Sequence, residues 1–279
     1  MTISSHFDSA DADVILLTTE ADCSTEFHVH KCILAAASSF FSDMFSLPQE
    51  TAEELPIIPV TETSSRLDTI LRCIYPVPDP VVETLDELAG ALGIAIKYDF
   101  TTALSALRKQ LVSRKHLLKS PIRVYAIACH YELEEEAQTA SRHTLNVNLL
   151  DAVPCKELKN ISGYDYHRLL TLHRRRSAAA LELIKAPVDL KCMHCNTSAF
   201  TCHDAPKWWY EFERGARVEL GARPTTDVIF GMEFLFKAAR ASGCMRCPES
   251  VLNSWKFLES LKAAIDALPS TVTCIETCS

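Results

Sequence analysis

Two pairs of cysteines in the C-terminal half of the chain have the spacing of metal ligands. Cys192 and Cys195 form one C-x-x-C motif, and Cys244 and Cys247 form a second. A C-x-x-C turn places two thiolates on one side of the backbone, at the separation that a tetrahedral zinc ion requires. Four thiolates fill the coordination shell and leave no position for water. The motifs therefore predict one structural zinc ion per chain, without a catalytic role.

The stretch between the two motifs is long for a zinc module. It comprises the 48 residues 196–243, whereas zinc ribbons have roughly 15 to 20 residues between their cysteine pairs. We therefore expect a helical insertion there and not a small finger. Cys202 and His203 lie inside this stretch and are alternative ligands, as is His194, which lies between two better candidates.

Two other interpretations of these cysteines remain open. They could be ordinary buried residues, although two C-x-x-C motifs that flank helices rarely arise by accident. They could also serve thiol–disulfide exchange, but no βαβ pattern surrounds either motif. We favour structural zinc over both.

The rest of the sequence lacks the motifs of the common enzyme classes. It contains no G-x-S-x-G, no Walker loop and no H-E-x-x-H, so we expect a protein that is not an enzyme. The basic run His173–Arg176 is interpreted as a solvated helix face, in preference to a nuclear signal or a patch for an acidic partner. Trp208–Tyr210 is interpreted as core at the start of a helix, in preference to an aromatic binding patch.

Composition narrows the functional classes further. The chain has 279 residues and a formal net charge of −8, whereas a protein that binds nucleic acid without sequence preference needs a positive excess to neutralise phosphates. Residues 1–11 lack the features of a signal peptide, and no apolar run approaches the roughly 20 residues that span a bilayer. We expect a cytoplasmic or nuclear protein, and the 12 cysteines are then reduced.

The N-terminal part shows short strands and helices. Val14–Leu17 is a short apolar run that predicts a buried strand, and residues 26–30 alternate as in a half-buried strand. Residues 31–45 predict two short helices interrupted at Ser38–Ser39. Residues 55–60 are β-branched but contain two prolines, which removes ladder donors and places this strand at a sheet edge.

From residue 82 onward the patterns are helical. The fold class predicted is an α+β domain followed by an all-helical region, with boundaries near Ser120–Pro121 and Ala186–Pro187. Helical periodicity or a proline at a first turn indicates helices at the following places: 82–96, 100–111, from Ser120–Pro121 to residue 131, 164–184, after Pro224 and after Pro248.

The residues from Asp13 to Leu16 and from Phe27 to Phe45 closely resemble the BTB/POZ domain family. The matched pattern is an Asp-Val strand followed by Phe-x-Val-His-Lys-x-x-Leu-Ala-x-x-Ser-x-Phe-Phe-x-x-Met-Phe. The resemblance implies that residues 1–118 form such a domain. It places Asp13 and Lys31 at the family's charged-pocket positions, where we interpret them as a partly buried pair that fixes the fold, ahead of a direct role in binding.

The resemblance extends less specifically beyond this domain. Residues 121–149 resemble the helical segment that often follows it, which suggests a BACK-like extension at 119–185. Residues 163–170 and the following arginine-rich helix are similar to BTB proteins of mushroom-forming fungi. The remaining residues, 186–279, would form a helical C-terminal region that contains the zinc site.

The resemblance also implies a function. It suggests a protein–protein interaction or adaptor protein that forms a homodimer through the BTB domain, with service as a substrate adaptor for a cullin-type ubiquitin ligase as a narrower expectation. The alternative is a zinc-containing transcriptional or nucleic-acid-binding regulator. The negative net charge of the chain and the wide spacing between the two cysteine pairs weigh against that alternative.

Overall fold

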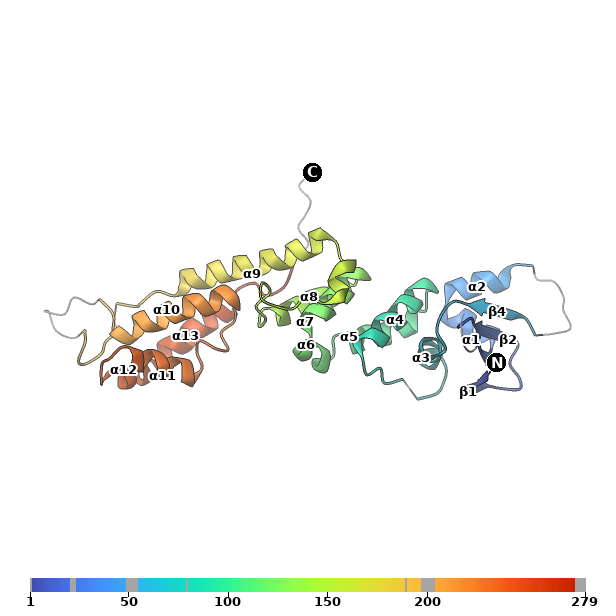
Figure 1. The fold of residues 1–279 in the computed structure, drawn as a ribbon, viewed down its shortest axis with the longest axis horizontal. Coiled ribbons are helices and arrows are strands. Elements are labelled where there is room, and N and C mark those ends of the chain that lie inside the picture. Colours follow the sequence, from blue (N-terminus) through green and yellow to red (C-terminus); the bar gives the residue numbers. More distant parts are fainter. Residues whose placement is uncertain are drawn as a thin grey trace. The chain divides into compact units, whose positions relative to one another are not determined.

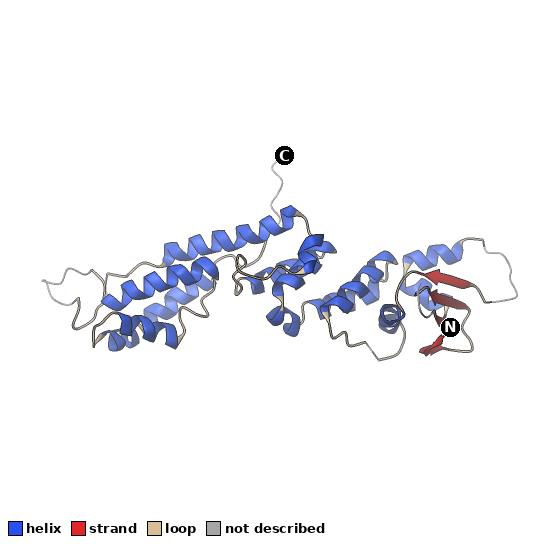
Figure 2. Ribbon diagram, in the orientation of Figure 1, coloured by secondary structure: helices blue, strands red, loops and turns tan. Residues whose placement is uncertain are grey.

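The structure is a computed structural model that describes residues 2–20, 24–48, 55–78, 80–188, 190–196 and 204–273. Contacts divide the chain into two compact units, Met1–Glu136 and Ala137–Ser279. Strands occur only in the first unit among the residues described, and helices build the second (Figure 2). The division into three parts, with boundaries near residues 118 and 185, stays a prediction.

The first unit combines a small sheet with helices (Figure 1). Its elements are β1 (Thr2–Asp8), β2 (Val14–Thr18), β3 (Thr25–Val29), α1 (Lys31–Ala37), α2 (Ser39–Ser46), β4 (Ile57–Val60), α3 (Ser64–Ile74), α4 (Leu85–Lys97), α5 (Thr101–Leu111), α6 (Arg114–Lys119) and α7 (Pro121–His130), and α8 (Glu134–Thr144) begins at its end.

The strand order of the sheet is β1-β3-β2-β4. Strands β2 and β3 pair antiparallel, and β4 adds to β2 in parallel. The position of β4 at an edge confirms the prediction from its prolines, because an edge strand can do without the missing donors. Strand β1, which the sequence patterns had not indicated, pairs in parallel with β3 at the other edge. Its one buried residue is Phe7, so β1 lacks the apolar run that marks β2.

A serine separates the two short helices predicted for residues 31–45. The Ser38 backbone is extended, and its side chain accepts a hydrogen bond from the Phe41 N–H at 3.1 Å, which caps α2. The same hydroxyl donates to the carbonyl of Tyr98 at 2.5 Å. The break between α1 and α2 is thereby fixed to the break between α4 and α5.

The second unit consists of helices packed along α9. Its elements are the rest of α8, a short 3₁₀ turn η1 (Lys156–Asn160), α9 (Gly163–Leu183), α10 (Lys207–Ala222), α11 (Met232–Ala241), α12 (Cys247–Asn253) and α13 (Trp255–Asp266). Helices α10 and α13 contact α9, and α11 contacts α10 (Figure 1). No helix in the described part of the chain is both long and apolar enough to cross a bilayer.

Two of the three prolines that were expected to begin helices do so. Pro121 and Pro248 each occupy the first turn of a helix, as expected. The expectation for Pro224 was wrong. Residues 223–231 form a loop with a turn at 227–230, and α11 begins only after Gly231. The Pro224 carbonyl instead accepts a hydrogen bond from Arg176 at 2.9 Å.

The core of the second unit is partly aromatic. Trp208 and Trp209 are fully buried, as predicted, and pack edge to face with ring centroids 5.8 Å apart. Tyr210 is exposed, so the prediction of core was wrong for this residue. It occupies the next helical position, which rotates it away from the core.

The basic run His173–Arg176 is only partly the solvated face that was predicted. Arg174 and Arg175 are exposed, whereas Arg176 is buried. Its guanidinium lies among backbone carbonyls at the end of α13, far away in sequence. Helical periodicity places Arg176 one turn after Leu172, on the side of α9 that faces the core.

Candidate metal centre

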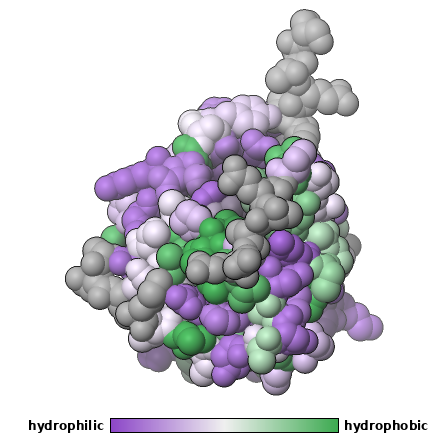
Figure 3. Space-filling view, turned by 90° about the vertical axis from the view of Figure 1, so that its right-hand side faces the viewer, coloured by the Kyte–Doolittle hydropathy of each residue, from purple (hydrophilic) through white to green (hydrophobic). Residues whose placement is uncertain are grey.

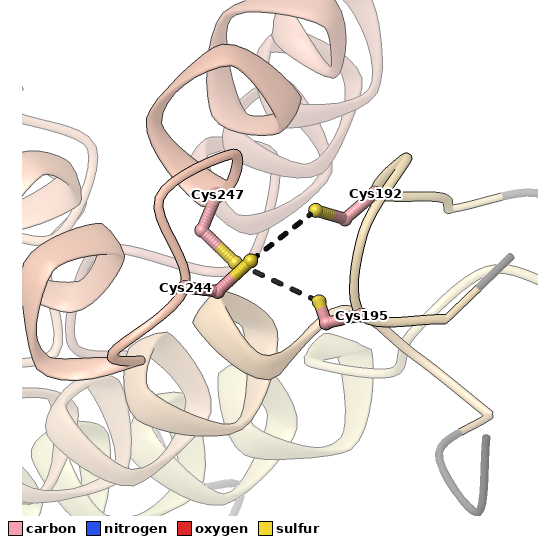
Figure 4. Close-up of side chains that lie close together, drawn as sticks. All are labelled: Cys192, Cys195, Cys244 and Cys247. Atoms are coloured by element: carbon pink, nitrogen blue, oxygen red, sulfur yellow. Dashed lines mark hydrogen bonds between the residues drawn. The ribbon is translucent and has the colours of Figure 1, made fainter.

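The four cysteines of the two C-x-x-C motifs meet at one place in the second unit (Figure 4). Their sulfur atoms all lie within 4.8 Å of one another. Cys192 Sγ is 3.8 Å from Cys244 Sγ, and Cys195 Sγ is 3.8 Å from Cys247 Sγ. All four are buried and free of disulfides. Within the described residues, this is the one group of three or more histidine, cysteine or acidic side chains arranged to hold a metal ion.

The sulfur separations fit a tetrahedral zinc ion. Zinc–thiolate bonds of about 2.3 Å in tetrahedral geometry place the sulfurs about 3.8 Å apart. Both of these sulfur pairs have that separation, which is far longer than the roughly 2.05 Å of a disulfide. A set of four sulfur donors also matches the closed shell of structural zinc sites. The residues present therefore fit the predicted ion.

The first pair of cysteines lies in a turn held by Asn196. The Cys192 N–H donates to Asn196 Oδ1 at 2.6 Å, and Asn196 Nδ2 donates to the carbonyl of Leu190 at 2.9 Å. The side-chain amide thus closes the turn with one acceptor and one donor. Cys195 Sγ in addition accepts from the N–H of Lys207, the first residue of α10, at 3.4 Å.

The second pair bridges a loop and a helix. Cys244 follows α11, and its N–H donates to the hydroxyl of Ser242 at 3.2 Å. Cys247 is the first residue of α12, and its N–H donates to the carbonyl of Cys244 at 3.2 Å. Gly243, which has a φ of 65°, allows the chain to reverse between α11 and this turn.

A buried hydrogen-bond chain joins the two halves of the site. Trp208 Nε1 in α10 donates to Ser250 Oγ in α12 at 3.0 Å, and Ser250 Oγ donates to the carbonyl of Lys191 at 2.8 Å. Three segments that are distant in sequence are thereby fixed around the cysteines. Because buried polar groups need such partners, this chain specifies one arrangement of the segments.

The thiols have unequal proton affinities. Burial raises the pKa of Cys195 to about 12 and also raises that of Cys247. Burial acts in the same direction on Cys244, but hydrogen bonds from the Arg246 N–H, from His194 and from neighbouring cysteines lower its pKa to about 6. Four thiolates this close together would repel one another strongly. A divalent cation is the group that permits all four to ionise.

The alternative ligands divide between described and undescribed residues. His194 lies beside the cluster, with Nδ1 3.6 Å from Cys244 Sγ, outside the four-sulfur set. Cys202 and His203 lie outside the described residues, and their exchange for one ligand stays open. Cys274 also lies outside the described residues.

Asp13 and Lys31 meet through the backbone. The exposed Asp13 carboxylate accepts a hydrogen bond at 2.7 Å from the N–H of Lys31, the first residue of α1. The Lys31 ammonium lies 5.8 Å from the centre of the Phe45 ring. The hydrogen bond joins the residue before β2 to the start of α1. Asp13 is exposed, so the expectation of a partly buried pair was wrong for this residue, and the fold-fixing role stays a prediction.

Two polar residues that support the cysteine cluster were not singled out from the sequence. Asn196 directly follows a ligand, which is the signal that could have indicated it. Ser250 carries no signal of its own, because its partners Trp208 and Lys191 are 42 and 59 residues away.

Comparison with known proteins identifies the domain in the first unit. Residues 5–115 match the model of the BTB/POZ domain family. This range covers most of the sheet and the helices through α5. A search of curated proteins found no match to the chain.

Proposed function

We propose that this chain, whose first unit contains a BTB/POZ domain at residues 5–115, acts by binding other proteins and not by catalysis. The domain match carries the proposal, since this domain supports a protein-interaction role. The narrower proposal is that two copies associate through it. Most soluble oligomers are closed and symmetric, and a two-fold dimer is their commonest form.

The surface of the first unit offers sites for such contacts. Its sheet has edge strands at β1 and β4, and each edge exposes an isoleucine, Ile3 and Ile57. Exposed edges can pair with another chain, and exposed apolar side chains add area to be buried. Figure 3 shows hydrophobic surface gathered near the middle of one face, with hydrophilic residues around it.

Light scattering on the purified full chain tests the self-association. A dimer has about twice the 31.1 kDa of one chain. We expect that mass at tens of micromolar, and a lower mass for Ile3→Asp or Ile57→Asp. Val218→Asp, at an exposed position of the second unit, is the matched control and should leave the mass unchanged. A monomeric mass for the unaltered chain would refute the proposal.

We propose further that a zinc ion held by Cys192, Cys195, Cys244 and Cys247 stabilises the second unit. The ion would supply four metal–thiolate bonds that fasten the turn before α10 to the start of α12. The buried set of four sulfurs supports a structural role, because four thiolates leave no coordination position for water or a substrate. In this arrangement the second unit presents a further surface to partners inside the cell, in the cytoplasm or nucleus.

Recruitment of a cullin is a more specific form of the same proposal. It rests on the domain match alone, because proteins that contain BTB/POZ domains include adaptors of cullin-type ubiquitin ligases. Direct binding between the purified chain and the cullin of its source organism tests it. Lack of binding at micromolar concentration would remove this partner and leave the general interaction role intact.

A further inference from the structure

A small pocket in the second unit lies between α9 and the segment that follows α13. Its volume is about 290 Å³, near the lower end of the range for small-molecule sites. It is distinct from the cysteine cluster and shares no residue with it. Its lining consists of Arg168, Thr171, Leu172, Arg175, Arg176 and Ala179 from α9 and Pro269, Thr271, Val272 and Thr273 from the later segment.

Hydrogen bonds hold the later segment in place. The Val272 N–H donates to Ser141 Oγ at 3.0 Å, and Arg168 Nε donates to the carbonyl of Thr273 at 3.2 Å. The Arg176 guanidinium donates to the carbonyl of Pro269 at 3.0 Å. Both walls of the pocket are therefore fixed before any ligand arrives, which lowers the entropy cost of binding.

The lining carries positive charge without acidic side chains. It contains three arginines and no aspartate or glutamate. Arg168 has a carboxylate neighbour in Asp165, 3.6 Å away. Arg176 bonds carbonyls and forms no ion pair with any described residue. The nearby Asp266 is already bonded to Lys262 and Thr226.

Arg175 is the arginine left available for a ligand. It is exposed and forms no hydrogen bond or ion pair within the described part of the chain. A guanidinium binds carboxylate and phosphate groups through two parallel hydrogen bonds. Thr171, Thr271 and Thr273 line the same space, and a threonine hydroxyl can donate to further oxygens.

The positive charge belongs to this unit and not to the whole chain. Residues 137–279 contain 18 basic and 15 acidic residues, whereas residues 1–136 contain 10 basic and 21 acidic ones. An anion would thus meet a favourable field at the second unit although the chain is acidic overall.

The remaining lining is apolar, from Leu172, Ala179, Pro269 and Val272. We propose that this pocket binds a small amphipathic anion whose carboxylate or phosphate group pairs with Arg175 while its apolar body covers the aliphatic floor. The volume admits a compact organic ligand and excludes a folded protein segment.

Calorimetric titration of the full chain tests the proposal with three probes of one shape. Phenyl phosphate carries a phosphate group and benzoate a carboxylate, whereas phenol is uncharged at neutral pH. We expect phenyl phosphate, benzoate or both to bind at least tenfold more tightly than phenol. Whichever anion binds more tightly identifies the class of head group.

Two adjacent arginines provide matched variants. Arg175→Gln should weaken binding of the anionic probe at least tenfold. Arg174→Gln removes the same charge from the same helix, but Arg174 is exposed and lines a different pocket, so its effect should stay below twofold. Circular dichroism of both variants checks the fold.

Three results would overturn the proposal. The first is absence of binding by either anionic probe at millimolar concentration. The second is equal binding of phenol, which would indicate an apolar cavity without anion recognition. The third is an equal loss of affinity in the Arg174→Gln and Arg175→Gln variants, which would indicate general charge attraction.

Discussion

A single buried arginine connects three segments of the second unit. Arg176 donates from Nε to the carbonyl of Pro224 at 2.9 Å and from its terminal nitrogens to those of Ile265, Leu268 and Pro269. The last residues of a helix leave carbonyls without intrahelical partners. The guanidinium donates to one of them, that of Ile265, and to the Leu268 and Pro269 carbonyls just after α13, so its own burial and theirs are compensated together.

Replacing Arg176 by methionine should therefore destabilise the second unit. The change retains bulk but removes the guanidinium donor from the carbonyls of Pro224, Leu268 and Pro269, whereas that of Ile265 still accepts from the Leu268 N–H at 3.1 Å. We expect a loss of about 2–4 kcal/mol. Chemical denaturation followed by circular dichroism measures this. Arg175→Met is the control, because Arg175 is exposed and unbonded within the described residues, and it should cost below about 0.5 kcal/mol. Equal effects of the two variants would contradict the role of Arg176.

His173 should make the second unit sensitive to acid. Burial lowers its pKa to about 4, and its Nε2 lies 3.1 Å from the hydroxyl of Thr144. In the unfolded chain a histidine titrates near 6.5, so the unfolded state binds the proton first as the pH falls. The contribution to stability is complete above about pH 6.5 and is lost progressively down to about pH 4.

Comparison with His173→Gln isolates this contribution. Between pH 7 and pH 5 the unaltered chain should lose about 1–2 kcal/mol more stability than the variant. Acid effects on the other groups, including the cysteines, are common to both proteins. Identical pH profiles from denaturation experiments would show that His173 is not titrating as described.

At the scale of elements, α10 and α12 depend on one tryptophan. Trp208 Nε1 donates to Ser250 Oγ, and its ring packs against Trp209 and Phe212. Trp208→Phe removes the donor and part of the ring, and should cost about 1–3 kcal/mol.

Trp255→Phe supplies the matched control for this change. Trp255 in α13 is about half exposed, with 46% of its surface accessible, so its loss should cost well under about 1 kcal/mol. Thermal unfolding monitored by circular dichroism compares the two. Equal midpoint temperatures of unfolding for the Trp208→Phe and Trp255→Phe variants would contradict the bridging role of Trp208.

Local patterns predicted those elements whose stabilising groups are near in sequence. Pro121 and Pro248 indicated helix starts because a first-turn proline acts through its own backbone. Ser38 likewise marked the break between α1 and α2. The four cysteines could be grouped because each C-x-x-C turn is itself local.

Features that depend on distant contacts could not be predicted in this way. Strand β1 is stabilised by pairing with β3 and has a weak apolar pattern. Arg176 has the sequence context of a solvated basic run, and its burial is explained by carbonyls 48 to 93 residues away. Ser250 likewise forms its hydrogen bonds with Trp208 and Lys191, which are distant in sequence. Propensity and periodicity contain no information about such partners.

At the scale of the whole molecule, the proposed zinc ion would close a loop of 48 residues, 196–243, within the second unit. By the loop-entropy relation for disulfides, such a cross-link would destabilise the unfolded chain by roughly 4 kcal/mol. Metal–thiolate bonding would add to this figure. Loss of the ion should therefore loosen the second unit and leave the BTB/POZ domain folded, since that domain contains none of the four ligands.

The most direct test is metal analysis of the full chain purified without chelator. We expect one zinc ion per chain, a loss of bound zinc in the Cys195→Ser and Cys244→Ser variants, and unchanged zinc content in Cys155→Ser, a free cysteine of the same unit outside the cluster. Absence of zinc from the unaltered chain, or unchanged zinc in the Cys244→Ser variant, would contradict the account.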